Sequence, residues 1–191
     1  MRFTVYDPLI LLLILLGIVV LVAPWLIRVY NMLVRGRNRV QEGWANIEVQ
    51  LNRRHELIPN IVNTVKGYAK HEDATFTQVT EARSRALGAK TPQDLASAER
   101  SLMRSLSGLY AVAENYPELK ASGNFTQLQG QLVDTEDQIQ EARTFYNGLV
   151  ARFNTAVESF PTNLVANVLG FKKFDFYDAP EEAGQASSVQ F

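Results

Sequence analysis

Cysteine is absent from all 191 residues of the chain, and its absence excludes several kinds of protein. A lipoprotein anchor needs an acceptor cysteine, so it is excluded, and a thiol nucleophile is excluded for the same reason. The missing cysteines fit a reducing compartment without establishing one, because a chain with no cysteine suits any compartment.

Histidine is scarce, and its two copies are poorly placed for a shared metal ion. His55 and His71 each precede a glutamate, as in a zinc metalloprotease helix, but that motif needs a second histidine four residues later, where Pro59 and Thr75 stand. Along a straight helix the two histidines would lie roughly 24 Å apart. A glycine-rich phosphate loop and a nucleophile elbow are also missing. We therefore expect no catalytic residue, no cofactor and no metal ligand, in a protein that is not an enzyme.

Neither sign of charge prevails, since 19 Lys and Arg stand against 20 Asp and Glu. This balance argues against a nucleic-acid-binding protein. Strand-like alternation of apolar and polar residues is also missing over any useful length, which argues against a sheet domain. The two absences together favour a helical protein with no nucleic-acid partner.

Charged residues are missing altogether from residues 9–27, which are almost wholly apolar. As a helix this run spans roughly the 30 Å hydrocarbon core of a bilayer, with Trp25 placed as an interfacial anchor. A cleaved signal peptide would have a shorter apolar run of about 7–15 residues, and its best-placed cut, after Ala23, has Pro24 just beyond it. We predict one transmembrane helix over residues 9–27, after a short leader of residues 1–8.

Basic residues gather on one side of this run. The membrane-orienting set that follows it is Arg28, Arg35, Arg37 and Arg39, whereas the only basic residue before it is Arg2. Because basic residues favour the cytoplasmic side, we predict a single-pass protein of the cell (inner) membrane, with its N-terminus outside and the rest of the chain in the cytoplasm. The arginines either set topology alone, which we favour, or also attract anionic headgroups by about 1 kcal/mol each.

Apolar residues after the span recur at spacings of three, four or seven, which is typical of helices that bury one face. These stripes cover residues 40–86, 95–116 and 125–160. Thr91 followed by Pro92 predicts the start of the second helix, and Pro117 and Pro161 follow the predicted ends of the second and third. The sequence therefore predicts an all-α protein, with a cytoplasmic up-and-down bundle of coiled-coil-like helices over residues 28–161.

Pro59 decides how many helices the bundle contains. Proline lacks an N–H group and disfavours helical geometry at the preceding residue, so the first stretch must bend or break there. A turn at Pro59 gives four helices of comparable length, whereas a kink leaves three long helices. Leu51, Ile58 and Val65 keep heptad phase across the proline, as a kink allows, but we favour the turn because an unbroken helix would outrun its partners.

A set of motifs between residues 30 and 175 carries a family resemblance. They include Tyr30-Asn31-x-Leu33-Val34, Arg37-Asn38-x-Val40-Gln41-Glu42-x-Trp44, Arg53-Arg54-x-Glu56-Leu57-Ile58-Pro59-Asn60, Thr64-Val65-Lys66-Gly67-Tyr68-Ala69, Glu114-x-Tyr116-Pro117, Ala142-Arg143-x-x-Tyr146-Asn147 and Gly170-Phe171. In these motifs the chain resembles the LemA family. The resemblance implies one N-terminal membrane helix and a cytoplasmic helical bundle, with no established enzymatic activity. Some relatives belong to machinery that shapes magnetosome membranes and others are encoded near membrane metalloproteases, which implies a scaffold or an adaptor.

Polar and aromatic residues of the first stretch are candidate interaction residues. Asn31 and Asn38 belong to an amide-rich segment, and buried amides can fix register between helices or between subunits. Arg53 and Arg54 are expected to form an ion-pair network with nearby glutamates on a helix surface. Trp44 lies on the first apolar stripe, so we expect it in the core, where truncation costs about 3–5 kcal/mol; a position at an interface is the alternative.

One local pattern occurs twice. Tyr30-Asn31-x-Leu33-Val34 with Asn38 is similar to Tyr146-Asn147-x-Leu149-Val150 with Asn154. We interpret the pair as two helices that solve the same packing problem rather than as an internal repeat.

The chain ends in an aromatic extension over residues 162–177 and a polar tail over residues 178–191. Aromatic residues at this density are expected to cover the open end of the bundle. The tail is expected to be flexible. Its last residues, Val189 and Phe191, are a candidate partner-binding terminus, because alternate apolar side chains beside a free carboxylate suit docking as an added strand.

Three functions follow from these patterns. The first is a non-enzymatic membrane scaffold or organiser that self-associates through its bundle, with the lipid bilayer and further copies of the chain in a homo-oligomer as partners. The second is an adaptor that presents partners to a membrane protease. The third, an unrecognised hydrolase, is the least favoured, because no catalytic constellation is present in the sequence.

Overall fold

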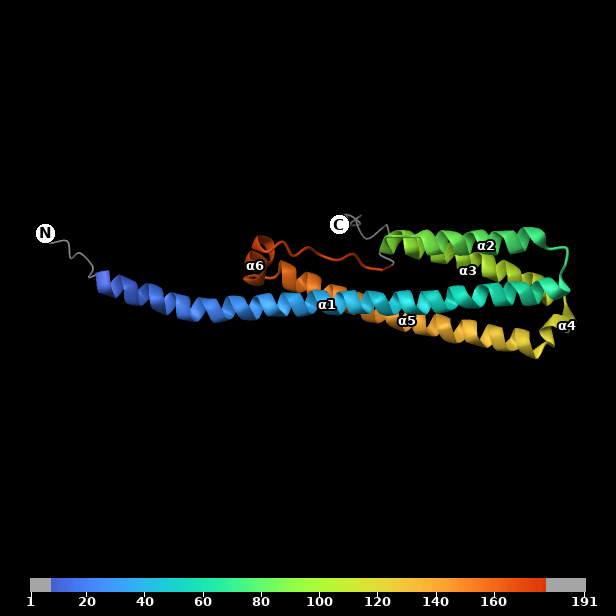
Figure 1. Cartoon of the computed structure of the whole chain (residues 1–191), viewed down its shortest axis with the longest axis horizontal. Helices are drawn as coiled ribbons and strands as arrows, with labels where there is room; N and C mark the ends of the chain where they lie inside the picture. The colour runs from blue at the N-terminus through green and yellow to red at the C-terminus, as the bar shows by residue number, and fades with distance from the viewer. Residues whose placement is uncertain (1–7, 178–191) are drawn as a thin grey trace, which may run out of the picture. The chain divides into compact units, whose positions relative to one another are not determined.

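The computed structural model describes residues 8–177, so the predictions for the leader before Pro8 and for Val189 and Phe191 lie outside it. Within the described residues the chain is helical and contains no strand, which confirms the all-α prediction. The helices are α1 (Pro8–Tyr68), α2 (Asp73–Gly88), α3 (Pro92–Glu114), α4 (Pro117–Lys120), α5 (Gly123–Glu158) and α6 (Thr162–Val168), labelled in Figure 1.

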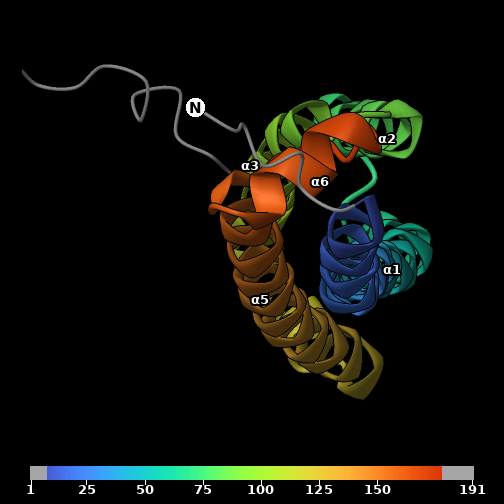
Figure 2. The same ribbon diagram turned by 90° about the vertical axis from the view of Figure 1, so that its left-hand side faces the viewer.

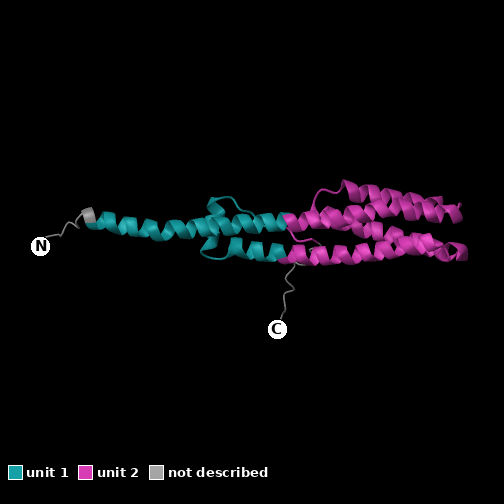
Figure 3. Ribbon diagram, turned by 60° about the horizontal axis from the view of Figure 1, so that its bottom comes forward, with its two compact units in different colours: residues 1–41, 149–174 teal, residues 42–148, 175–191 magenta. Residues whose placement is uncertain are grey.

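The chain divides into two compact units, coloured separately in Figure 3. Unit 1 contains residues 1–41 and 149–174, and unit 2 contains residues 42–148 and 175–191. The long helices α1 and α5 each contribute residues to both units.

Unit 2 is a bundle formed by the second half of α1, α2, α3 and the first half of α5, with the short helix α4 between α3 and α5. Its core draws buried side chains from every one of these helices: Ile58, Ile61, Val65, Phe76, Val79, Ala82, Leu102, Leu106, Leu109, Leu119, Phe125, Leu128 and Leu132. Nearly all of these positions belong to the three predicted apolar stripes. The spacing of the apolar residues therefore predicted which faces of the helices meet.

The expected turn at Pro59 is wrong, because α1 continues as a helix through this proline to Tyr68. The chain reverses instead at residues 69–72, before α2 begins at Asp73. Four helices still form in unit 2, but their first boundary lies about nine residues later than the sequence suggested.

A side chain from another helix explains why α1 survives the proline. Pro59 has no N–H to donate to the carbonyl of His55, four residues earlier. Arg83 of α2 supplies the missing donor, since its Nε lies 2.8 Å from that carbonyl oxygen. His55 is buried, so the bond satisfies an acceptor that water would reach poorly.

The start of α3 matches the sequence prediction. Thr91 precedes the helix in an extended conformation, and its Oγ1 accepts a hydrogen bond from the backbone N–H of Asp94 at 3.1 Å. Pro92 occupies the first helical position, where a missing N–H costs nothing.

Unit 1 packs α1 closely against the last turns of α5, and α6 lies beside the end of α5 in both Figure 1 and Figure 2. A Cβ atom on Gly36 would come within 2.9 Å of the Phe153 ring, so this glycine permits the close approach of the two helices. Phe153 is itself buried and makes an edge-on contact with Phe174, whose ring centroid is 5.3 Å away.

The first part of α1 exposes its apolar side chains throughout. An 18-residue window of this helix has a mean hydropathy of 3.1, and none of the window is buried. Of the helices described, α1 alone is long and apolar enough to cross a membrane. Length and exposure both agree with the span predicted over residues 9–27.

The contact between Arg83 and Pro59 can be tested by a double-mutant cycle. Arg83→Met should lower the free energy of unfolding by about 1–3 kcal/mol, because the buried His55 carbonyl loses the donor that α2 supplies. Pro59→Ala restores a backbone N–H to this carbonyl, so Arg83→Met should cost much less in the Pro59→Ala background. Denaturation of the four proteins followed by circular dichroism measures the coupling. Additive costs in the two backgrounds would contradict this account.

Candidate functional site

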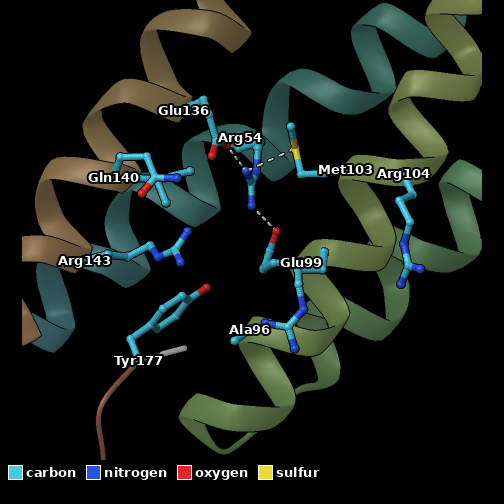
Figure 4. A pocket seen from close by; sticks show the side chains of 11 residues that line it. Arg54, Ala96, Glu99, Met103, Arg104, Glu136, Gln140, Arg143 and Tyr177 are labelled. Atoms are coloured by element: carbon cyan, nitrogen blue, oxygen red, sulfur yellow. Dashed lines mark hydrogen bonds and ion pairs between the residues drawn. The ribbon is translucent and has the colours of Figure 1, made fainter. Parts of the chain in front are cut away.

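A buried arginine joins three helices of unit 2 (Figure 4). Arg54 of α1 is only 3% exposed, and its guanidinium forms ion pairs with Glu99 of α3 and Glu136 of α5. Its Nη1 lies 2.5 Å from Oε2 of Glu136 and 3.4 Å from the sulfur of Met103. One cation therefore holds carboxylates from two different helices.

His55 completes this cluster from the next position of α1. Its Nε2 lies 2.7 Å from Oε1 of Glu99, while the other carboxylate oxygen of Glu99 binds Arg54. An ionised carboxylate only accepts hydrogen bonds, so in a pair with ionised Glu99 the Nε2 of His55 is the donor. Both carboxylate oxygens of Glu99 thus have a partner inside the bundle, and a buried carboxylate requires such partners.

The charged cluster forms one wall of a pocket of about 600 Å³. The pocket is lined by Arg54, Ala96, Glu99, Arg100, Met103, Arg104, Glu136, Ile139, Gln140, Arg143 and Tyr177. On the wall opposite Arg54, the guanidinium of Arg143 lies over the ring of Tyr177, 4.7 Å from its centroid (Figure 4). Burial raises the pKa of the Tyr177 hydroxyl above its ordinary value, and the nearby Arg143 opposes this shift.

Tyr177 reaches the pocket because amide and hydroxyl groups of α5 hold its backbone. Asn147 forms two hydrogen bonds with Tyr177, accepting from its N–H at 2.9 Å and donating to its carbonyl at 3.1 Å. The Tyr146 hydroxyl donates to the carbonyl of Asp175 at 2.9 Å. An extended segment without strand partners thereby satisfies its backbone groups with side chains.

In unit 1 a second asparagine of α5 holds the chain in the same way. Asn154 donates to the carbonyl of Phe174 and accepts from its N–H, both at 2.9 Å. Asn147 and Asn154 belong to the second copy of the repeated sequence pattern. Asn31 and Asn38, from the first copy, are exposed. The sequence pattern contains both pairs of asparagines. Only their contacts with residues far away in the sequence show that the second pair binds backbone groups and the first pair does not.

Arg53 and Arg54 prove to lie in opposite environments. Arg53 is exposed, as predicted, and donates to Oε1 of Gln138 at 3.2 Å. The prediction for Arg54 is wrong, because this residue is buried and its partners lie on other helices instead of on the surface of α1. Glu99 and Glu136 were not singled out in the sequence, since an acidic residue within a polar helix face carries no local sign of burial.

Trp44 lies on the predicted stripe but is only half-buried. Its ring makes an edge-on contact with Tyr146, with centroids 5.5 Å apart, and lies 6.2 Å from the Tyr177 ring. Its indole N–H donates to Oε1 of Glu48 at 2.7 Å. Trp44 therefore packs against the ring of Tyr177, whose backbone is bound by Asn147, and against the ring of Tyr146.

The charged side chains of this cluster bind one another and in doing so join helices. Within residues 8–177 no group of three or more His, Asp or Glu side chains is arranged to hold a metal ion. The two carboxylates lie against Arg54, and Glu99 also lies against His55, so each carboxylate has a partner within the bundle. Such a cluster contributes specificity of helix pairing more than stability.

Residues 43–191 match the model of the LemA family. The chain belongs to the LemA family. Membership agrees with the motifs found in the sequence, and together with the exposed apolar segment of α1 it supports a membrane protein.

Curated relatives of this LemA family chain carry two kinds of name. The chain is 25% identical to the magnetosome protein MamQ of Magnetospirillum gryphiswaldense over 188 residues, which cover 85% of this chain and 69% of the relative. It is 26% identical to magnetosome protein MamQ 2 of Paramagnetospirillum magneticum, with the same coverage. It is 28% identical to protein LemA of Metamycoplasma hominis over 155 residues, which cover 79% of this chain and 69% of the relative.

Adjacent arginines allow a matched test of the buried cluster. Arg54→Met should lower the free energy of unfolding by about 3–5 kcal/mol, because Glu99 would remain buried without its cation. Arg53→Met, one position away and exposed, should change it by less than about 1 kcal/mol. Urea denaturation of the full chain in detergent micelles measures both. Equal costs for the two variants would show that Arg54 does not hold the bundle together.

Proposed function

We propose that the chain is a single-pass membrane protein whose helical bundle acts as a non-enzymatic, self-associating scaffold. The observation that carries the proposal is the continuity of α1. A single helix holds both the exposed apolar segment over residues 10–27 and the bundle core from Ile47 to Val65. The proposed membrane span and the first helix of the bundle are therefore parts of one element, which suits a protein that organises others at a membrane surface.

The charged pocket supports a structural role over a catalytic one. Its carboxylates pair with Arg54 and His55, so their charge is used to position helices. A general acid or base would instead need to reach a substrate with a proton to transfer. The names of the magnetosome relatives are compatible with a role in organising a membrane compartment.

Self-association is favoured by the position of Asn31 and Asn38. These residues are seven positions apart on one side of α1 and are exposed in the single chain. Amides at heptad spacing set register where helices meet. Because the amides of α5 are used inside the chain while these two are not buried there, a second copy is the partner that would use them.

The proposed orientation places the bundle in the cytoplasm of a bacterial cell, with the N-terminus across the inner membrane. Arg28, Arg35, Arg37 and Arg39 are all exposed and follow the apolar segment directly. The chain has no natural cysteine, so Ser107→Cys places a single thiol on the exposed side of α3. We expect a membrane-impermeant maleimide to label it only after lysis. Labelling in intact cells would overturn the orientation.

The mass of the full chain in lipid nanodiscs tests the scaffold. We expect a homo-oligomer at physiological concentration, and the double variant Asn31→Ala, Asn38→Ala should shift the mass toward the monomer. The control is Asn46→Ala with Asn52→Ala, two exposed amides of unit 2, which should leave the mass unchanged. A monomeric wild-type chain would reject self-association and favour the adaptor function instead. An oligomer that survives both double variants would place the interface elsewhere.

A further inference from the structure

Residues 160–169 of unit 1 expose several large apolar side chains, and their exposure to water is unfavourable. Phe160 is 80% exposed and Val168 is 86% exposed, while Leu164 and Leu169 are each half-exposed or more. The buried side of α6 is apolar as well, since it consists of Val165 and Ala166. Clustered exposed apolar residues of this kind mark an interaction surface.

Leu164, Val168 and Leu169 form a groove together with α1. The groove has a volume of about 620 Å³ and is lined by Trp25, Leu26, Ile27, Tyr30, Leu164, Val165, Val168 and Leu169. All of these residues belong to unit 1. Almost every atom at its surface belongs to an aliphatic or aromatic side chain, so the groove suits a hydrocarbon chain.

The position of the groove along α1 identifies its occupant. Trp25, Leu26 and Ile27 are the last residues of the uncharged run, and Arg28 follows at once. In a helix that crosses a bilayer, these residues lie where the acyl chains meet the headgroups. The acyl chains that cover Leu26 and Ile27 must therefore also reach the side chains of α6 on the other wall.

The fold holds α6 in this place by a defined helix end. Gly170 has φ = +71°, and the N–H of Phe171 donates to the carbonyl of Ala166 at 2.9 Å, which is the pattern of a Schellman motif. The chain then returns to α1, where the Phe171 ring lies 6.3 Å from the Tyr30 ring and 5.6 Å from the guanidinium carbon of Arg37. The contacts of Phe171 with Tyr30 and Arg37 thus lie next to the apolar groove, on the side where the lipid headgroups are expected.

Basic residues follow the apolar residues in both walls. On α1 the order is Leu26, Ile27 and Arg28, and after α6 it is Leu169, Gly170 and then Lys172, which is exposed. Both segments therefore change from apolar to basic along the chain just after the residues that line the groove. This order fits a phospholipid with its acyl chain in the groove and an anionic headgroup among the basic side chains.

We propose that residues 160–169 form a second membrane contact, which lies in the bilayer interface and cradles an acyl chain of an anionic phospholipid against Trp25 to Tyr30 of α1. The proposal rests on the membrane span of the proposed function. It adds a lipid-binding element to a helix that would otherwise cross the bilayer alone.

Single cysteines can report the depth of each part of the chain separately. Val168→Cys probes the proposed contact, Leu16→Cys probes the span, and Ser107→Cys probes unit 2 as the control. Each full-length variant is labelled with an environment-sensitive fluorophore and reconstituted in phosphatidylglycerol and phosphatidylcholine vesicles that contain doxyl-labelled lipid. We expect shallow doxyl groups to quench the label at position 168 at least several-fold more than the label at position 107.

The three labels separate two kinds of failure. Quenching of the label at position 16 by deep doxyl groups, without quenching at position 168, would overturn the second membrane contact and leave the span intact. Absence of quenching at position 16 would overturn the span and, with it, the proposed function.

Retained lipid tests the cradle itself. Native mass spectrometry of the full chain with phosphatidylglycerol should show bound lipid on the wild type and at least several-fold less on Leu164→Asn with Val168→Asn. The matched control, Leu87→Asn with Val133→Asn, replaces two apolar residues of unit 2 that are also more than half exposed and should retain the lipid. Equal retention by all three proteins would overturn the cradle. Equal retention of phosphatidylcholine would overturn the requirement for an anionic headgroup.

Discussion

The burial of Arg54 between two carboxylates is the constraint on which the bundle of unit 2 depends. Its guanidinium must meet Glu99 of α3 and Glu136 of α5 at the same time. A slip of either helix by one turn, about 5.4 Å, would separate the charges and leave at least one of them buried without a partner. Apolar contacts alone would tolerate such a slip better. The charged cluster therefore fixes the register of α3 and α5 against α1, which the apolar stripes do not determine.

The same turn of α1 also carries Pro59, and the two features act together. Between Arg54 and Pro59, α1 receives a guanidinium from α2 through Arg83 and carboxylates from α3 and α5. Polar groups from the three other long helices of unit 2 therefore meet within little more than one turn. The proline frees a carbonyl that Arg83 uses, which adds α2 to the set of helices whose register this turn determines.

Local patterns predicted the helices, the apolar faces and the start of α3, because each depends on residues close in sequence. The boundary between α1 and α2 was not predictable in this way, since the donor that preserves the helix at Pro59 comes from Arg83 on the next helix. The role of Arg54 was hidden for the same reason. Its partners are 45 and 82 residues away, whereas the nearby glutamates of α1 suggested a surface network. Asn147 and Asn154 likewise resemble ordinary polar positions until residues 174 and 177 are placed against them.

The side chains discussed above fall into two sets, those that bind partners inside the chain and those that remain exposed. Arg54, Asn147 and Asn154 meet their partners inside the chain. Asn31 and Asn38 remain exposed, and so do the apolar side chains of Phe160, Leu164, Val168 and Leu169. All of these exposed groups belong to unit 1, the unit that also contains the apolar run of α1. Since clustered exposed apolar side chains mark an interaction surface, unit 1 is where the proposed contacts with lipid and with further copies of the chain are to be sought.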